Sequence, residues 1–523
     1  MNHPFKQTTV LIFVFAGFFC ATVRAQNLEV VGVTLLRSVA TNVDGSGIRV
    51  AQPEAYDNGT TNWEVNPANS LVQQPVNLFT YTSALGSTNN FPNTLNNESS
   101  HADGVAGNFY GVPAGVATNV VHVDNYDANY FYNSIIEASN PANINDAVVN
   151  QSFVFGPLSI SQQQQVDQVY DNYAARYNTL FVSGAGNGGM VMAAATSYNG
   201  IGVGVSDGSS SIGPTLDNGR AKPDIIAPGG ATSFSTPYVS GAASILMQAG
   251  LRGDGGSDTN SAADIRTLKA LLLNGAIKPV DWTNDAPSPL DPRYGAGVLN
   301  VFNSYEQLAG GEHGYIISAS IPTNSPHPVT GDAGTVSRLS GWDFNTNSSS
   351  ATNDGVNHYY FDVTNNLSNA TFTATATLVW NRHKNKTDIN NLDLFLYDVI
   401  SSNLVAGSTS LVDNVEHIFV PGLPQGRYDL QVFKSGGAIV SRDETYALAF
   451  EFFSMPIAIA KSGTNAILNW PIYPMGFVLQ STTNLSPPIV WNTNNPARVV
   501  TNHQNFVTFG VTNANQFFRL RRP

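Results

Sequence analysis

Residues 222–243 have the sequence KPDIIAPGGATSFSTPYVSGAA. The apolar run Asp224–Ala227 predicts the end of a short strand, a Pro-Gly-Gly turn follows, and Thr232 and Ser233 open a predicted helix. Pro237 is expected in the first helical turn, where a missing N–H costs little. Unpaired backbone N–H groups at a helix N-terminus favour developing negative charge. Ser233 is therefore a candidate nucleophile for a reaction that forms an oxyanion, and an N-cap serine is the ordinary alternative.

This stretch resembles the serine motif of the subtilisin-like proteases, or subtilases, which is Gly-Thr-Ser-Met-Ala-x-Pro-His-Val-Ala-Gly. Residues 231–241 read Ala-Thr-Ser-Phe-Ser-Thr-Pro-Tyr-Val-Ser-Gly. Ala231 replaces the leading glycine and Tyr238 replaces the histidine after proline, and neither change removes a catalytic atom. The resemblance implies that Ser233 is the nucleophile of a serine protease.

A second stretch, Gly45–Ala55, predicts a turn that leads into a strand. It resembles the subtilase motif Gly-x-Gly-Val-x-Val-Ala-Val-x-Asp-x-Gly, in which the aspartate at the strand end is the triad acid. The resemblance assigns this role to Glu54, which carries the same charge on a longer arm. Asp57 is the alternative acid, and a surface glutamate at a strand end is the ordinary interpretation.

His101 lies in the segment Ser99–Gly107, which predicts the start of a helix. The end of the segment matches the subtilase histidine motif His-Gly-Thr-x-Val-Ala-Gly, whereas Ala102 and Asp103 depart from it. The acid, the histidine and the serine follow one another along the chain in the subtilase order. The resemblance makes His101 the general base.

Two other strand ends are similar to subtilase segments. Ala147–Phe153 predicts a buried strand leading into a loop, and Thr179–Gly189 predicts a buried strand and a glycine-rich turn. The second matches the Ala-Gly-Asn-x-Gly motif, which makes Asn187 the side-chain donor of an oxyanion hole. The first is similar to the segment that runs beside the substrate. The resemblance assigns substrate binding to Asn150, Ser152 and Gly184.

Strand and helix patterns alternate between residues 45 and 305, which predicts an α/β domain with a parallel sheet and helices on both faces. One of its predicted helices covers Ala262–Ala276. Short strands after residue 311 predict a β-sandwich or jelly roll and then a small C-terminal β-module. The expected divisions are residues 1–25 (signal peptide), 26–310 (subtilisin-like peptidase domain), 311–456 (β-sandwich) and 457–523 (C-terminal β-module).

Residues 1–25 have a polar head, the apolar run Val10–Cys20 and a small-residue exit ending at Ala25, the pattern of a secretory signal peptide. Cys20 is the only cysteine, so the mature chain would have neither disulfides nor a thiol nucleophile. No later stretch is apolar and long enough to cross a bilayer. The formal net charge of -13 argues against nucleic acid as a partner. We expect an exported protein, extracellular or at the cell surface, with a protein or peptide substrate; no pattern indicates its oligomeric state.

Triad chemistry requires no cofactor. Calcium is an additional expectation from the family, with oxygen ligands available at one loop, but polar turn residues are the favoured interpretation of that loop. The residues concerned are Asp388, Asn390, Asn391 and Asp393.

Two other functions are open. A non-catalytic exported scaffold with the subtilase fold is favoured by the glutamate in place of aspartate and by the altered histidine motif. An esterase of the α/β-hydrolase type would use Ser206, in a Gly-x-Ser-x-Gly sequence at residues 204–208. The segment after Ser206 does not predict the helix that a nucleophile elbow opens, which makes the esterase the weaker alternative.

Overall fold

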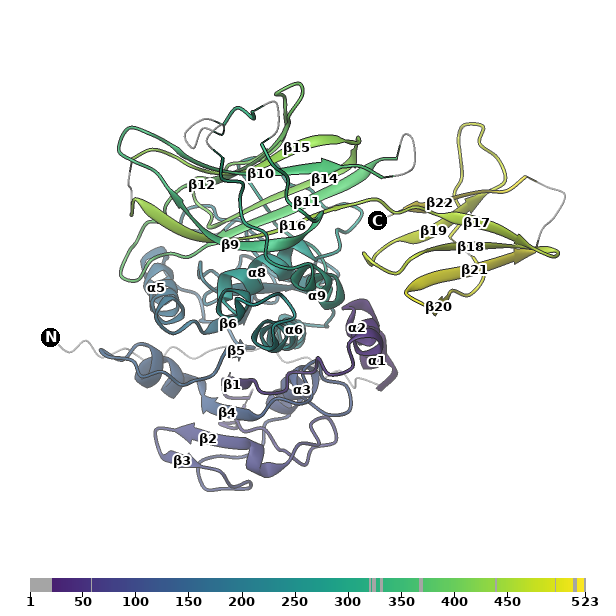
Figure 1. Ribbon diagram of the computed structural model, residues 1–523. Coiled ribbons are helices and arrows are strands. Elements are labelled where there is room, and N and C mark those ends of the chain that lie inside the picture. The colour runs from purple at the N-terminus through teal and green to yellow at the C-terminus, as the bar shows by residue number, and fades with distance from the viewer. Residues whose placement is uncertain are drawn as a thin grey trace.

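The computed structural model describes residues 21–57, 59–318, 321, 326–329, 333–365, 370–437, 440–493, 495–510 and 515–521. The predicted signal peptide lies outside the described residues, apart from the backbone of residues 21–25, which begins helix α1. Figure 1 shows an α/β domain, a β-sandwich over one side of it, and a small β-module beside them. The chain builds these three parts in that order.

An eight-stranded sheet with the order β3-β2-β4-β1-β5-β6-β7-β8 forms the centre of the first part. All neighbouring strands are parallel except β2 and β3, which form an antiparallel pair. Strands β5 to β8 are buried throughout, as expected for parallel strands covered on both faces. The predicted α/β class is confirmed. The strands are β1 Arg49–Glu54, β2 Phe79–Ser83, β3 Gly86–Thr88, β4 His122–Asp127, β5 Val148–Gln151, β6 Leu180–Gly184, β7 Ile201–Val205 and β8 Ile225–Ala227.

Helices α5 and α6 cover opposite faces of this sheet. Gly184 of β6 packs against α6, whereas the ring of Phe181 lies 5.0 Å from that of Tyr170 on α5. Side chains alternate along a strand, so residues 181 and 184 point to opposite faces. No helix in the described part of the chain combines the length and the apolar character that crossing a membrane requires. The helical segments are α1 Ala21–Val30, α2 Val33–Val39, η1 Val76–Leu78, α3 Ser100–Phe109, α4 Ala128–Tyr130, η2 Phe131–Ile136, α5 Ile160–Tyr177, α6 Thr232–Arg252, α7 Thr259–Ala262, α8 Ile265–Asn274 and α9 Val301–Ala309.

The helices differ from the sequence predictions at two places. The single helix expected over Ala262–Ala276 is divided between α7 and α8, because the Asp264 side chain caps α8 by accepting from the Arg266 N–H at 2.9 Å. The other difference concerns Pro237, which lies inside α6, six residues into the helix and not in its first turn. This proline leaves one helical carbonyl without its usual donor.

Two antiparallel four-stranded sheets form the second part and confirm the predicted sandwich. Their orders are β10-β15-β12-β13 and β14-β11-β16-β9. Residues such as Phe361, Leu378 and Phe450 fill the space between them. The strands are β9 Ser340–Ser348, β10 Gly355–Val363, β11 Phe372–Trp380, β12 Leu392–Asp398, β13 Leu404–Ser408, β14 Val415–Leu423, β15 Gly426–Lys434 and β16 Asp443–Phe453.

The outer face of the second sheet packs on helices α8 and α9 (Figure 1). Trp342, Val379 and Ala449 from this sheet belong to the same buried cluster as the interior of the α/β domain. An ion pair of 2.7 Å between Arg382 and Asp171 crosses the contact, with the two side chains 5% and 1% exposed. The α/β domain and the outer face of the sandwich therefore share one buried core, while the space between the two sheets of the sandwich forms a second one.

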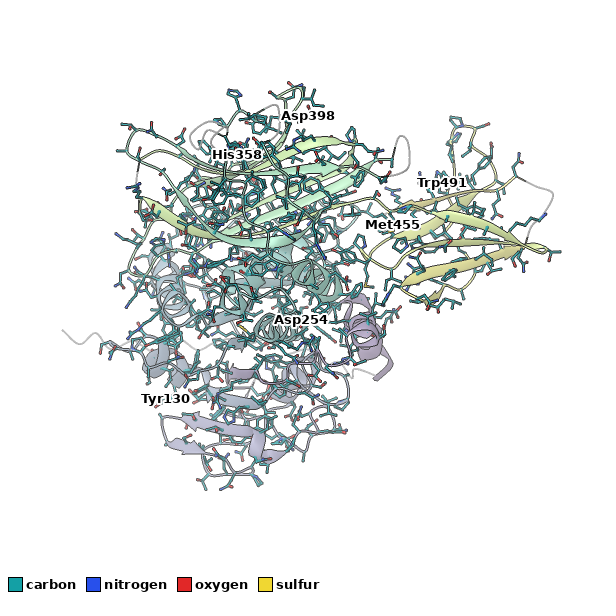
Figure 2. All side chains as sticks on the ribbon, viewed as in Figure 1. Tyr130, Asp254, His358, Asp398, Met455 and Trp491 are labelled. Atoms are coloured by element: carbon teal, nitrogen blue, oxygen red, sulfur yellow. The ribbon has the colours of Figure 1, made fainter. Side chains whose placement is uncertain are left out.

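The third part is the small β-module. Figure 2 labels Met455 in the connection from β16 and Trp491 within the module. The Met475 N–H donates to Asn303 on α9 at 2.8 Å, which joins the module to the α/β domain. Its strands are β17 Ala458–Ser462, β18 Asn465–Pro471, β19 Val478–Thr482, β20 Val499–Thr501, β21 Gln504–Gly510 and β22 Phe517–Arg521.

Candidate active site

Glu54 and His101 form a buried pair at the centre of the large sheet. Glu54 ends strand β1, and polar residues of a parallel sheet collect at the carboxyl ends of its strands. Its side chain is fully buried, and its Oε2 atom lies 3.0 Å from Nδ1 of His101. This contact favours a proton on Nδ1, facing the carboxylate, so that Nε2 is the acceptor nitrogen of the neutral ring. Nε2 is buried and has no hydrogen-bond partner among the described residues.

Helix α3 carries His101 in its first turn. The hydroxyl of Ser99 caps this helix by accepting from the Ala102 N–H at 3.2 Å. The ring of Phe234, next to Ser233 on α6, lies 5.7 Å from the His101 ring. A side chain at Gly104 would come within 2.8 Å of the same phenylalanine, so the glycine permits this approach of the two helices. The histidine and the serine are thus placed on adjoining first turns.

Asp57, the alternative acid, lies at the N-terminus of α3. Its Oδ2 atom accepts from the hydroxyls of Ser99 at 3.1 Å and Ser100 at 3.3 Å. A carboxylate is favourable there because the helix dipole is positive at that end. The carboxylate hydrogen-bonded to His101 Nδ1 is that of Glu54.

Ser233 is the second residue of α6, and it exchanges hydrogen bonds with Ser152, just after β5. The Ser233 hydroxyl donates to the Ser152 carbonyl at 3.1 Å, and the Ser152 hydroxyl donates to the Ser233 carbonyl at 2.9 Å. The usual donor to the Ser233 carbonyl would be the N–H four residues on, which Pro237 lacks. Ser152 therefore supplies the hydrogen bond that the proline within the helix leaves open.

Asn187 follows β6 and lies against the start of α6. Its Oδ1 atom accepts from the N–H of Thr232 at 2.8 Å and from the Thr232 hydroxyl at 3.0 Å. Ala231, in the N-cap position, has no side-chain hydrogen bond to give, so Asn187 caps the helix from another element. None of the described residues accepts from its Nδ2 group, and the side chain is exposed. Its amide donor is available beside Ser233.

Comparison with known proteins matches residues 46–297 to the subtilase family. Residues 46–297 are a subtilase domain. The family is one of serine peptidases. A separate comparison with curated proteins finds no match for this chain.

Solved structures similar to part of this chain include two proteases and a macrocyclase. The prenylagaramide maturation protease PagA has 19% identity and a TM-score of 0.37, over 54% of this chain and 99% of that chain. The PatG macrocyclase, solved with a peptide, has 15% identity and a TM-score of 0.39, over 54% and 96%. The epidermin leader peptide processing serine protease of Staphylococcus aureus has 15% identity and a TM-score of 0.39, over 57% and 84%.

Two of the residues assigned to substrate binding lie beneath the surface of the subtilase domain. Asn150 is fully buried, and its amide donates to the Ser152 hydroxyl at 3.0 Å while accepting from Ser240 at 2.8 Å. A side chain at Gly184 would come within 3.1 Å of Thr232 Oγ1, so this glycine is where β6 approaches α6. Asn150 and Gly184 therefore support α6, and substrate binding at these two residues stays a prediction. Ser152 is the member of the three that contacts Ser233.

Asp103, a departure from the subtilase histidine motif, anchors a loop to α3. It accepts from the Asn66 N–H at 2.7 Å and from the Asn69 side chain at 2.8 Å. Burial, together with its hydrogen bond to Glu98, raises the pKa of Asp103 to about 9. The group is therefore a neutral carboxylic acid at pH 7, able both to donate and to accept. Its role is structural support of the helix that carries His101.

Sequence reasoning overlooked Gln52 and Tyr110, which are fully buried and hydrogen-bonded next to Glu54. Gln52 Nε2 donates to Glu54 Oε1 at 2.8 Å, and the Tyr110 hydroxyl donates to Gln52 Oε1 at 2.5 Å. One signal was present in the sequence. Gln52 precedes Glu54 by two positions on a predicted strand, so the two side chains lie on the same face.

The remaining predicted sites are not part of this cluster. Asn390 Oδ1 accepts from the N–H groups of Val440 and Ser441, at 3.3 and 3.2 Å, as in a polar turn. Within the described ranges, no group of three or more His, Cys, Asp and Glu side chains is arranged to hold a metal ion, and calcium binding stays a prediction. Ser206 follows β7 in a turn and opens no helix, unlike the serine of a nucleophile elbow.

Proposed function

We propose that this chain is an exported serine endopeptidase that hydrolyses peptide bonds through a Ser233–His101–Glu54 triad. The observation that carries the proposal is the 3.0 Å contact between Glu54 and His101, which come from separate motifs and meet in a buried site. The position of His101 beside the first turn of α6, where Ser233 lies, supports the same proposal. Proteins or peptides are the proposed substrates.

The reaction proceeds by acyl transfer. Ser233 Oγ attacks the scissile carbonyl carbon, and its proton passes to Nε2 of His101. The carbonyl oxygen becomes an oxyanion that accepts from Asn187 Nδ2 and from the Ser233 N–H, which has no helical acceptor in the first turn. The C–N bond then breaks as His101 returns the proton to the leaving amine. Water, deprotonated by His101, releases the acyl group and restores the serine.

Glu54 supports the positive charge that His101 acquires. Burial by itself lowers the pKa of His101, but the charge of Glu54, their hydrogen bond and the charge of Asp57 outweigh it, and the pKa is raised above the ordinary value of 6.5. The imidazolium formed during each proton transfer is stabilised accordingly.

This shift predicts how activity depends on pH. His101 accepts a proton from Ser233 only when it is neutral, so kcat/KM should fall as the pH falls, with a midpoint above 6.5. The measurement is the rate of hydrolysis of a chromogenic peptide from pH 4 to pH 9 under conditions where the protein stays folded. An acid limb with a midpoint below 6.5 would contradict a base held by a buried carboxylate.

The test of the function is labelling by a serine-directed fluorophosphonate. We expect the purified protein to be labelled, and we expect no labelling of Ser233→Ala or His101→Ala. Ser244→Ala is the matched control, since Ser244 lies buried on the same helix and, among the described residues, its hydroxyl donates only to the Ser240 carbonyl. Labelling that persists in Ser233→Ala, or is absent from the wild type, would reject the triad and favour the non-catalytic scaffold.

Export is part of the proposal and rests on the signal-peptide pattern of residues 1–25. Residues that follow the predicted cleavage point pack into the domain, since Val31, Val33 and Leu36 are fully buried. We therefore expect secreted protein, wild type and Ser233→Ala alike, to begin at Gln26 by N-terminal sequencing. A start well beyond Leu36 would mean that this packed segment is removed.

A further inference from the structure

Gln52 makes hydrogen bonds to three groups, one on its own strand β1 and one at each end of helix α3. Its Nε2 group donates to Glu54 Oε1 at 2.8 Å and to the Ala102 carbonyl on α3 at 3.0 Å. Its Oε1 atom accepts from the Tyr110 hydroxyl, at the other end of α3, at 2.5 Å. The side chain is fully buried in the central strand of the sheet. One amide therefore joins the acid, the start of the histidine helix and the end of that helix.

The chemistry of the partners permits only one orientation of this amide. Glu54 and the Ala102 carbonyl are both acceptors and require the two N–H bonds of Nε2. The Tyr110 hydroxyl is then left to donate to the amide oxygen. Burial, followed by the charges of Tyr81, Glu54 and Asp103, raises the pKa of Tyr110 well above its ordinary value, so the phenol keeps its proton.

A glutamate needs such a partner more than an aspartate does. The glutamate side chain has one more rotatable bond, so its carboxylate can adopt more orientations in which the contact with His101 is lost. In the structure, each carboxylate oxygen has its own donor: Oε1 receives Gln52, and Oε2 faces His101. Because the Gln52 contact fixes Oε1, it also determines that Oε2 points toward His101.

We propose that Gln52 is a positioning residue, whose amide, held by Tyr110, fixes the Glu54 carboxylate so that it faces His101. The inference rests on the proposed function, because it concerns the same triad. Gln52 makes no hydrogen bond to His101 or Ser233 and acts through Glu54.

Removing the donor should change both rate and pH dependence. Gln52→Met keeps the shape and removes the hydrogen bonds, and we expect kcat to fall on the order of 10- to 100-fold, the effect of a hydrogen bond to a charged group, with KM changed by less than about threefold. A carboxylate that is no longer held toward His101 supports the imidazolium less, so the acid limb should move to lower pH. Tyr110→Phe should change kcat and the midpoint of the acid limb in the same directions as Gln52→Met, but by smaller amounts.

The neighbouring charges are the same in all these variants. Asp57 faces the imidazole from the loop after β1, while Asp103 and Tyr81 face Tyr110 from α3 and β2. None of them is changed, so a displaced acid limb reports the Glu54–His101 pair.

A matched control lies on the next strand. Gln151 of β5 is equally buried and donates to a buried tyrosine, Tyr170, at 2.6 Å, but on the opposite face of the sheet. Gln151→Met and Tyr170→Phe should lower stability and leave the acid limb in place. If they displace it as much as Gln52→Met does, the effect belongs to packing, and the proposal is wrong.

A double-mutant cycle tests the route through Glu54. In the Glu54→Ala protein, Gln52→Met should change the residual kcat by less than about threefold, because no carboxylate remains to be positioned. A full loss in that background would show that Gln52 acts elsewhere and would overturn the proposal.

An activity-independent measurement separates this inference from the proposed function. The His101 imidazole can be titrated by NMR in the Ser233→Ala protein, with His101→Gln to assign its signal. Adding Gln52→Met should lower the pKa of His101, and an unchanged or raised pKa would overturn the positioning role. If the wild type neither hydrolyses peptides nor reacts with the fluorophosphonate, the function fails while this titration still decides the role of Gln52.

Discussion

Glu54→Ala should reduce kcat on the order of 10⁴-fold while the protein remains folded. Loss of the triad acid has an effect of this size in other serine proteases, because the imidazole loses its tautomer and the imidazolium its counter-charge. Glu54 is fully buried, so water does not replace its carboxylate at Nδ1 of His101. Peptide hydrolysis by purified variants, with circular dichroism to check folding, gives the measurement.

Two further variants make the assignment of the acid specific. Glu54→Asp should retain part of the activity, since it keeps the charge but shortens the arm that reaches His101. Asp57→Ala should cost less than about tenfold, because Asp57 bonds to the hydroxyls of Ser99 and Ser100. The opposite order, with Asp57→Ala inactive and Glu54→Ala near wild type, would show that the acid is misassigned.

A chain that ends at residue 310 should fail to give a soluble, folded monomer, although every triad motif precedes that residue. Truncation there exposes the surfaces of α8 and α9 that the sandwich covers, and it removes Trp342, Val379 and Ala449 from the shared core. Asp171 would also lose its ion pair with Arg382. Expression in the soluble fraction and a cooperative urea transition are the two readouts. A soluble truncated chain with a wild-type urea midpoint would contradict the shared core.

A point substitution tests one ion pair between the α/β domain and the sandwich. Arg382→Ala should destabilise the full chain by about 3 to 5 kcal/mol, the usual cost of leaving a buried charge unpaired. Asn199, which accepts from the Arg382 N–H at 2.7 Å, keeps its backbone partner in this variant. Arg293→Ala is the control, because its ion pair with Asp281 lies at the surface, and its urea midpoint should not change. Equal midpoints for both variants would mean that the buried pair contributes nothing.

The local motifs were sufficient to predict the subtilase domain and its strand ends. Glu54 ends, Asn187 follows and Ser233 opens an element whose apolar pattern and turn residues are visible in the sequence. The sandwich was predictable for the same reason, since its strands alternate with a period of two. The interrupted helix over Ala262–Ala276 was less predictable, because Asp264 fits either a helix interior or a cap until its backbone turns.

The amino-acid sequence by itself determined the order of the elements and the residue types at the site, because turn chemistry and hydrophobic period act over a few neighbouring residues. Only the tertiary structure decided that Tyr110 and Gln52 together hold Glu54. It also decided that the Ser152 hydroxyl donates to the Ser233 carbonyl, which Pro237 leaves without a backbone donor. Finally, it decided that the sandwich completes the core of the α/β domain. Apart from the Gln52–Glu54 bond within β1, each of these contacts joins segments from different elements. Their hydrogen bonds and burial depend on where the sheet brings those segments together, which no local pattern encodes.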